Sequence, residues 1–200
     1  MVHIYHGVRE AARMRIRVIG GEFGGRQLDS PRGRGTHPMG ERIRNALFNS
    51  IQHELQGAEV LDAYAGTGAL GLEALSRGAA HASFVESGRV PQKIIANNID
   101  RLRLDEERAK LYRARVNSWI STNPDAKFDV IFVDPPYYDF ERHLSTVERL
   151  LGLLKPGALM VLSKPGKCEE SVNLRDNRDV VVDVARSYSG ATLVFYRKKA

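Results

Sequence analysis

The sequence predicts one α/β domain whose core is an open, mostly parallel β-sheet with helices on both faces. Three observations predict it. Beyond Gly57, short apolar runs alternate with stretches of helical periodicity, and such alternation buries both faces of a parallel sheet. The first apolar run leads directly into a glycine-rich turn. The last two runs, residues 179–185 and 191–197, flank Ser189-Gly190 and predict a C-terminal antiparallel hairpin.

The N-terminal region is predicted to lie outside this alternation. Residues 1–13 show no clear period, which indicates a poorly ordered extension. Residues 15–19 and 23–28, with Gly20-Gly21 between them, predict a small β-hairpin. A loop rich in Pro, Gly and Arg follows. The predicted division of the chain is an extension at residues 1–13, a hairpin and basic loop at 14–40, and a main domain at 41–200.

The main domain is expected to begin with a helix from Glu41, because Ile43, Leu47, Ile51 and Leu55 recur at four-residue spacing. The strands that follow are predicted at residues 59–64, 81–86, 110–113, 128–133 and 158–162. The helices between them are predicted at residues 70–76, 90–102, 117–122 and 140–154.

Composition limits the classes of protein that fit. With 200 residues and 42% hydrophobic content the chain can form one compact core, but two full domains would be cramped. A single cysteine, Cys168, excludes an intrachain disulfide framework and a multi-cysteine metal site. No apolar run approaches the roughly 20 residues that cross a bilayer, and no signal-peptide pattern stands near the start. We therefore expect a soluble, cytoplasmic protein without a metal.

The net charge of +6 is concentrated at the N-terminal end of the chain. The first 44 residues hold nine arginines and no lysine against four acidic residues, so they carry +5 of that charge. Arginine favours bidentate contacts with phosphate and stacking on bases, which indicates a nucleic-acid partner. A solvated arginine-rich surface without a partner would give the same composition, and composition alone does not separate the two.

The glycine-rich turn predicts a cofactor site. Gly66, Gly68 and Gly71 form a G-x-G-x-x-G pattern, and Glu86 follows at the end of the second strand, as in a dinucleotide fingerprint. Glycines let the backbone approach a ligand at a helix N-terminus. Asp62, four residues before the first glycine, favours a cofactor with an α-amino group, because it would repel a pyrophosphate. The candidate cofactor-binding residues at this turn and at the second strand are Asp62, Tyr64, Ala65, Gly66, Thr67, Gly68, Glu86 and Ser87.

A second candidate site follows the fourth strand of the main domain, which ends in Asp134, Pro135, Pro136 and Tyr137. Ligands of open α/β sheets bind outside the carboxyl ends of the strands, so this motif should share one cleft with the glycine turn. The Asp134 carboxylate and the Pro135 carbonyl can accept hydrogen bonds from an exocyclic amine and stabilise the positive charge that grows on it. The prolines fix the backbone, and Tyr137 offers a flat face for a base. We predict these four residues to be catalytic.

Residues 17–28 (RVIGGEFGGRQL), 38–48 (PMGERIRNALF) and 68–79 (GALGLEALSRGA), in this order, resemble the RsmD family of 16S rRNA guanine-N2 methyltransferases. The resemblance covers nearly all of residues 14–200. It implies a Rossmann-like class I methyltransferase fold with a seven-stranded sheet. It also implies S-adenosyl-L-methionine as cofactor, its methionine part held by the Asp62 to Gly68 turn and its ribose hydroxyls by Glu86. The substrate implied is one guanine of 16S rRNA within an assembling 30S subunit, and we expect a monomer.

The chain departs from the family pattern at three places. The family usually has Arg-Pro-Thr where this chain has His37-Pro38-Met39, and Asp where it has Gly40 or Glu41, which argues against RNA contacts by that loop. After the third strand the family carries Asp or Asn followed by Ala near the adenine, whereas this chain has Arg115, Val116 and Asn117; we take Val116 and Asn117 as adenine-pocket candidates. After the fifth strand the family often has an acidic residue, whereas this chain has Ser163-Lys164, for which we expect no role in discriminating bases.

The basic residues of the N-terminal region are predicted to contact RNA, mostly at phosphates. The set is Arg15, Arg17, Arg26, Arg32, Arg34, Arg42 and Arg44. Three alternatives remain open at this point. The protein could be an adenine-N6 methyltransferase acting on DNA or other RNA, because the Asp-Pro-Pro-Tyr motif serves that chemistry too. It could be an NAD-binding oxidoreductase, although no hydride-transfer site is legible. It could also be a catalytically silent factor that binds rRNA.

Overall fold

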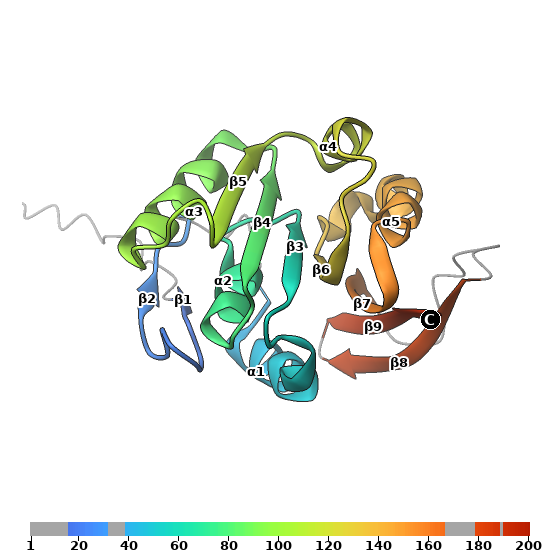
Figure 1. Cartoon of the computed structure of the whole chain (residues 1–200), viewed down its shortest axis with the longest axis horizontal. Coiled ribbons are helices and arrows are strands. Elements are labelled where there is room, and N and C mark those ends of the chain that lie inside the picture. Colours follow the sequence, from blue (N-terminus) through green and yellow to red (C-terminus); the bar gives the residue numbers. More distant parts are fainter. Residues whose placement is uncertain (1–15, 32–38, 167–178, 189) are drawn as a thin grey trace, which may run out of the picture.

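The computed structural model describes residues 16–31, 39–166, 179–188 and 190–200 (Figure 1). The predicted extension at residues 1–13, and Arg15, Arg32, Arg34 and Cys168, lie outside the described residues. The helices are α1 (Glu41–Ser50), α2 (Ala69–Ser76), α3 (Arg89–Arg101), α4 (Val116–Thr122) and α5 (Leu144–Leu151), with 3-10 segments η1 (Gln52–Glu54) and η2 (Tyr137–His143). The strands are β1 (Ile16–Arg17), β2 (Gln27–Leu28), β3 (Glu59–Ala63), β4 (His81–Glu86), β5 (Ala109–Arg113), β6 (Phe128–Val133), β7 (Leu154–Pro165), β8 (Val180–Tyr188) and β9 (Ala191–Lys198).

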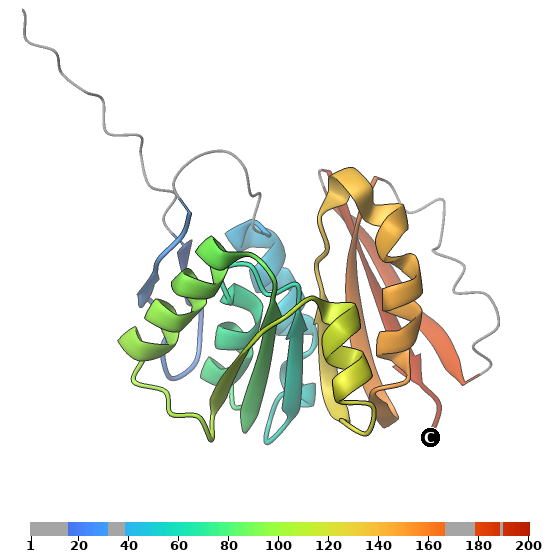
Figure 2. The same ribbon diagram turned by 90° about the horizontal axis from the view of Figure 1, so that it is seen from above.

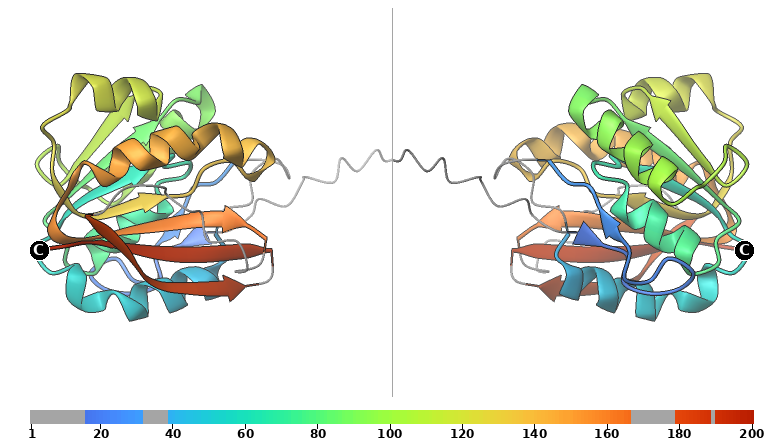
Figure 3. Two further views of the ribbon diagram at one scale, coloured as in Figure 1. Left: turned by 90° about the vertical axis from the view of Figure 1, so that its right-hand side faces the viewer. Right: turned by 90° about the vertical axis from the view of Figure 1, so that its left-hand side faces the viewer.

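Strands β3 to β9 form one seven-stranded sheet in the order β5-β4-β3-β6-β7-β9-β8. The five strands β3 to β7 run parallel to their neighbours within this group. β9 pairs antiparallel with both β7 and β8, and the left view of Figure 3 shows the long C-terminal hairpin beside β7. The predicted mostly parallel sheet with a C-terminal antiparallel hairpin is therefore confirmed.

Two hydrophobic cores lie on opposite faces of this sheet. Helices α1, α2 and α3 pack on one face and α4 and α5 on the other, with α1 below and α4 above the sheet in Figure 1. Successive side chains of a strand point to opposite faces. On β3, Val60 joins the core under α1 to α3, whereas Leu61 and Ala63 join the core under α4 and α5. Burial on both faces explains why the parallel strands are almost continuously apolar.

The carboxyl ends of the parallel strands lie together along one edge of the sheet, at the top of Figure 2. The segments that leave β3, β4 and β6 therefore start side by side, since these strands are neighbours in register: Asp62 of β3 stands opposite Phe84 of β4 and Phe132 of β6. This placement brings the two candidate motifs to the same edge.

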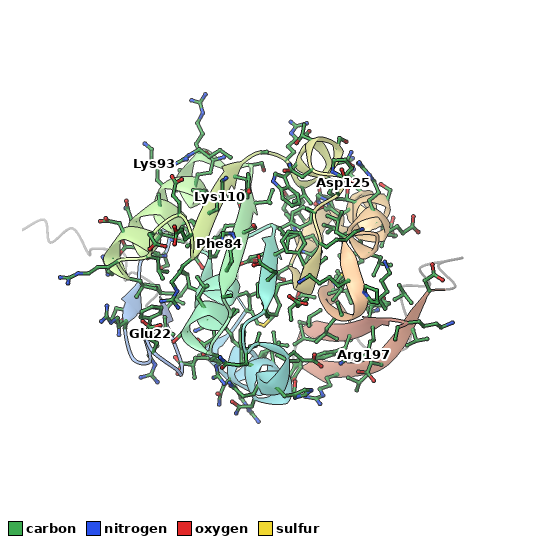
Figure 4. The ribbon with its side chains drawn as sticks, viewed as in Figure 1. Glu22, Phe84, Lys93, Lys110, Asp125 and Arg197 are labelled. Carbon is green, nitrogen blue, oxygen red and sulfur yellow. The ribbon has the colours of Figure 1, made fainter. Side chains whose placement is uncertain are left out.

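Strand β8 forms the outer edge of the sheet at its C-terminal side. Its pairing with β9 shifts register between Val182 and Val184, which makes a β-bulge at Asp183. Val181 and Val182 are 45% and 48% exposed on this strand. The Arg197 side chain, labelled in Figure 4, donates hydrogen bonds to Glu54 and Asp183, so it ties β9 to both η1 and β8.

The N-terminal hairpin is held by α2 rather than by its own ladder. β1 and β2 pair over two residues only, Ile16 with Leu28 and Arg17 with Gln27. The backbone N–H groups of Ile19 and Gly20 donate to the Glu73 carboxylate at 2.7 and 3.0 Å. That carboxylate is fully buried and also accepts from Arg77 Nε at 2.7 Å. The hairpin thus belongs to the same packed unit as the sheet, although its two ladder pairs alone would be marginal.

Several predicted boundaries were wrong. The helix from Glu41 ends at Ser50, whose hydroxyl donates back to the Leu47 carbonyl at 2.7 Å, and a separate 3-10 turn follows. The helix predicted at residues 140–154 covers three elements: η2, α5 and the start of β7. The apolar pair Leu153-Leu154 continued the helical period, but Leu154 pairs with Phe128 of β6. Tertiary pairing decided that boundary.

Within the part of the chain that the structure describes, no helix combines the length and the apolar character needed to cross a bilayer. The same described residues contain no group of three or more His, Cys, Asp or Glu side chains arranged to hold a metal ion.

Candidate active site

The turn between β3 and α2, residues 62–71, is here called the glycine loop. Gly66 and Gly68 have φ of 57° and 77°, in the left-handed region that favours glycine. Among the described residues, a Cβ added at Gly66 would approach only the Tyr64 carbonyl, at 3.9 Å, so this part of the structure leaves room for a ligand beside Gly66. At Gly71 an added Cβ would lie 2.4 Å from the Phe84 ring, so that glycine serves helix packing (Figure 4). The loop therefore has the open backbone that a cofactor needs.

Glu86 connects the glycine loop to the turn after β4. Its Oε2 accepts a hydrogen bond from the Gly66 N–H at 2.9 Å, and its Oε1 accepts one from the Gly88 N–H at 2.6 Å. Each carboxylate oxygen keeps a further lone pair. The neighbouring Ser87 is exposed. The arrangement places a half-buried carboxylate beside the open face of Gly66, where it can accept bonds from ligand hydroxyls.

Asp62 supports the loop from inside. The side chain is 1% exposed, and its Oδ2 accepts the Gly71 N–H at 2.9 Å in the first turn of α2. Burial raises the pKa of Asp62 well above its usual value; the Gly71 bond opposes the shift, and the carboxylates of Asp134 and Glu86 add to it. The Gly71 amide is thus one partner of this carboxylate, and the contact of Asp62 with a ligand amine stays a prediction.

The remaining predicted residues of the loop are largely internal. Ala65 and Thr67 are 7% exposed each, and the Ala65 N–H donates to the Val85 carbonyl at 3.1 Å. The Thr67 carbonyl accepts from the side-chain amide of the fully buried Asn98 at 3.0 Å. Tyr64 is half-buried with φ of 64°, which is unusual for a residue with a Cβ. These contacts fix the shape of the loop from behind.

The second motif, residues 134–137, is here called the DPPY loop. Asp134 is half-buried, and burial raises its pKa to about 6, while a hydrogen bond with Ser163 acts in the opposite direction. Tyr137 is 37% exposed and its hydroxyl shares a short hydrogen bond with Ser163 Oγ. Burial, followed by the charge of Asp134, raises the pKa of Tyr137 to about 12. Pro135 is buried between the two.

The sequence analysis expected no role for Ser163 in discriminating bases and did not predict its contacts with the DPPY loop. Ser163 is 2% exposed on β7 and bonds to both Asp134 and Tyr137. The signal that could have found it is topological. Val133 of β6 pairs with Leu162 of β7, so the residue after each stands at the same edge of the sheet.

Burial is the main cause of the raised pKa of Asp62, and the charge of Asp134 in the DPPY loop adds to it, as does that of Glu86 at the end of β4. Three carboxylates from three neighbouring strands therefore surround one small region at the carboxyl edge. The two predicted adenine-pocket residues stand at the start of α4, which follows β5, and their role stays a prediction. Val116 is 5% exposed in the core under α4 and α5, and the Asn117 side chain and carbonyl accept hydrogen bonds from Arg149 of α5.

The predicted RNA-binding arginines differ in their surroundings. Arg17 is ion-paired with Glu41 at 2.7 Å, the Arg26 guanidinium lies 5.7 Å from the centre of the Phe23 ring, and Arg42 is exposed. Arg44 was predicted wrongly. It is 2% exposed and donates to the carbonyls of Met39 and Arg17, so its guanidinium binds the fold internally.

Comparison with known proteins gives consistent matches. The family model described as "Conserved hypothetical protein 95" matches residues 16–197. The Haemophilus influenzae protein named "Ribosomal RNA small subunit methyltransferase D" is 31% identical over 156 residues, which cover 74% of this chain and 78% of that protein. The Escherichia coli K12 protein of the same name is 37% identical over 122 residues, 61% of this chain and 60% of that protein.

Two solved structures share the fold over almost the whole chain. The Escherichia coli structure described as "Putative methyltransferase yhhF" superposes with a TM-score of 0.80 at 28% identity, covering 94% of this chain and 99% of that one. The Thermus hypothetical protein TTHA0928 superposes with a TM-score of 0.73 at 25% identity, covering 92% and 99%.

Proposed function

The chain belongs to the RsmD family, and from this premise we propose that it transfers the methyl group of S-adenosyl-L-methionine to the exocyclic N2 amine of a guanine in 16S rRNA. The observation that carries the proposal is the meeting of the glycine loop and the DPPY loop at one sheet edge, because β3 and β6 are parallel neighbours and Ala63 pairs with Val133. Methyl transfer needs a donor and an acceptor site that share one cleft, as the class I methyltransferase fold provides.

The glycine loop and Glu86 fit the cofactor. The open space beside Gly66 admits the chain of the ligand, and the lone pairs that Glu86 keeps can accept two ribose hydroxyls. Asp62 supports this site by holding the first turn of α2, with Thr67 and Gly68 shaping the backbone. When bound, S-adenosyl-L-methionine supplies an electrophilic methyl group on a sulfonium. The residues of this chain bind and orient the donor at this place.

The DPPY loop fits the acceptor amine. An exocyclic amine is a weak nucleophile because its lone pair is delocalised into the ring. We propose that the Asp134 carboxylate and the Pro135 carbonyl accept hydrogen bonds from the two N–H groups of this amine. These bonds favour the nucleophilic form of the amine and stabilise the positive charge that develops on its nitrogen. Pro135 and Pro136 fix the backbone between these acceptors and Tyr137. Tyr137, held by Ser163, presents the ring on which the base stacks.

The rate of methyl transfer is expected to fall as the pH is lowered through about 6. Below the pKa of Asp134 its carboxyl group is neutral. It then no longer accepts a hydrogen bond from the amine as a carboxylate or balances the positive charge that develops on the amine nitrogen, so the rate drops about tenfold per pH unit. Ser163→Ala removes the hydrogen bond that lowers this pKa, so the midpoint should move to higher pH. The single-turnover rate of incorporation of labelled methyl groups, measured across pH for the wild type and for Ser163→Ala, tests both expectations. A wild-type rate that does not change with pH near 6 would contradict the role of ionised Asp134.

The substrate assignment rests on the family and on the basic N-terminal region. We propose phosphate contacts from Arg17, Arg26 and Arg42, together with Arg15, Arg32 and Arg34, which stand outside the described residues. We further propose that the protein acts in the cytoplasm as a monomer, on rRNA within an assembling 30S subunit.

Incubation of the protein with undermethylated 30S subunits and labelled S-adenosyl-L-methionine tests this function. The expected result is N2-methylguanine at one position of 16S rRNA, identified by mass spectrometry of nucleosides and by mapping of the labelled nucleotide. N6-methyladenine as the product would overturn the guanine assignment. Binding of rRNA without methyl incorporation would indicate a silent assembly factor instead. Naked 16S rRNA, as the parallel substrate, separates recognition of the RNA from recognition of the particle.

A further inference from the structure

A chain of hydrogen bonds joins the glycine loop to η2, the segment that continues the DPPY loop. The Tyr64 hydroxyl lies 3.0 Å from His143 Nδ1, and His143 Nε2 lies 3.3 Å from Asp139 Oδ1. The rings of Tyr64 and His143 also meet edge to face, with centroids 4.9 Å apart and planes at 79°. Tyr64 precedes Gly66 by two residues, and Asp139 follows Tyr137 by two. The contact thus spans from one loop of the candidate active site to the other.

One neutral tautomer of the His143 ring serves both contacts. With the hydrogen on Nε2, the ring donates to Asp139 Oδ1 and its Nδ1 accepts from the Tyr64 hydroxyl. The Tyr64 hydroxyl also has a side-chain hydrogen bond with Thr146. The His143 and Asp139 side chains are 23% and 26% exposed. Mostly shielded from water, these bonds hold their geometry better than bonds on an open surface.

Both ends of the chain of bonds sit at irregular backbone. Tyr64 has φ of 64°, which costs free energy for a residue with a Cβ and is commonest at functional sites. Asp139 has non-helical angles, φ of −135° and ψ of 32°, where two short turns of η2 meet at a kink. His143 therefore bonds to the kink of η2 with one nitrogen and to the strained residue of the glycine loop with the other.

We propose that Tyr64 and His143 are positioning residues, which hold the DPPY loop in register with the glycine loop so that the acceptor amine faces the methyl donor. This inference rests on the function proposed above. Its physical reason is the steep dependence of group transfer on alignment, since a displacement of about 1 Å can cost about 100-fold in rate. If the two rings only packed against each other, the Tyr64 hydroxyl would not be needed. Removing that hydroxyl while keeping the ring therefore distinguishes a hydrogen-bonded link from a packing contact.

The test removes hydrogen bonds but keeps rings. Tyr64→Phe deletes only the hydroxyl, His143→Phe deletes both nitrogens, and the double variant completes a cycle. Tyr138→Phe is the matched control, because Tyr138 stands on the same segment, is 89% exposed and has no hydrogen-bond partner among the described residues. Three quantities are measured for each: backbone hydrogen exchange of residues 137–143 without ligand, affinity for S-adenosylhomocysteine, and the single-turnover rate on 16S rRNA at saturating substrates.

For Tyr64→Phe we expect about fivefold faster exchange across residues 137–143, as follows from loss of one hydrogen bond. The single-turnover rate should fall about tenfold, with cofactor affinity changed less than about twofold. The double variant should lose no more than Tyr64→Phe, because both single variants break the contact between Tyr64 and His143, and the bond of Tyr64 with Thr146 is already lost in Tyr64→Phe. Tyr138→Phe should match the wild type in all three.

Two results would overturn the link between Tyr64 and His143. One is a hydrogen-exchange rate and a single-turnover rate of Tyr64→Phe that both stay within about twofold of the wild type. The other is a loss of rate in the double variant that equals the product of the two single losses. Exchange is measured without RNA or cofactor, so it decides the link even if the wild type methylates no rRNA. That last result would overturn the proposed function alone.

Discussion

Replacement of Asp134 by alanine is expected to lower the rate of methyl transfer by about 10²- to 10³-fold or more, while S-adenosylhomocysteine still binds. Asp134 is the only carboxylate of the DPPY loop, and the proposed mechanism needs it to accept from the amine and to balance the charge that develops there. The cofactor site is formed by the glycine loop and Glu86, which keep their backbone contacts in this variant. Single-turnover rates with saturating rRNA, and calorimetric titration with S-adenosylhomocysteine, measure the two properties.

Asp134→Asn makes the test sharper. The asparagine keeps one side-chain oxygen that can accept an N–H group but has no charge and does not titrate. We expect part of the activity to remain and the dependence on pH near 6 to disappear. Asp125→Ala is the control, because this exposed residue lies far from the DPPY loop, in the turn before β6 (Figure 4). Full turnover by Asp134→Ala would remove Asp134 from the mechanism.

Glu73→Gln is expected to lower the free energy of unfolding by about 3–5 kcal/mol, the range found when one partner of a buried ion pair is removed. The Glu73 carboxylate is fully buried, where it binds Arg77 and the N–H groups of Ile19 and Gly20. Glutamine has a similar shape but loses the charge, and its amide group would face N–H donors. The Arg77 side chain, 9% exposed, would then remain a buried cation without its counter-charge.

Urea unfolding followed by circular dichroism measures this loss. The matched control is Glu22→Gln, which breaks the ion pair between Glu22 and Arg108. The Glu22 and Arg108 side chains are 56% and 35% exposed, so this variant should lower the free energy of unfolding by about 1 kcal/mol or less. Equal destabilisation by the two variants would show that Glu73 does not anchor the hairpin in the way its contacts indicate.

The sequence analysis was most accurate where local pattern and tertiary packing agree. The bounds of β4 and β6 were predicted to the residue, because each is a buried apolar run that ends in a polar group at the carboxyl edge. The shared edge of the two loops followed from the rule for parallel sheets. The identity of the cofactor and of the substrate did not follow from periodicity at all; it came from the resemblance of longer blocks to one family.

Two of the failures have a common physical cause, because they depend on contacts between residues far apart in the chain. Arg44 has the charge of a surface residue, yet it closes a buried network with Arg17 and Met39. Ser163 acquires its contacts only when β7 pairs with β6. The kink at Asp139 inside η2 is a local irregularity that helical periodicity does not detect, because apolar residues stand on both sides of it.

The β-bulge at Asp183 has a consequence for how the molecule behaves in a crowded solution. An unpaired edge strand such as β8, with Val181 and Val182 half exposed, is a template on which a strand of another molecule could add. The extra residue interrupts the regular spacing of free N–H and C=O groups, and it places a carboxylate in the middle of the edge. Fibril-like stacking of copies through this edge is thereby disfavoured.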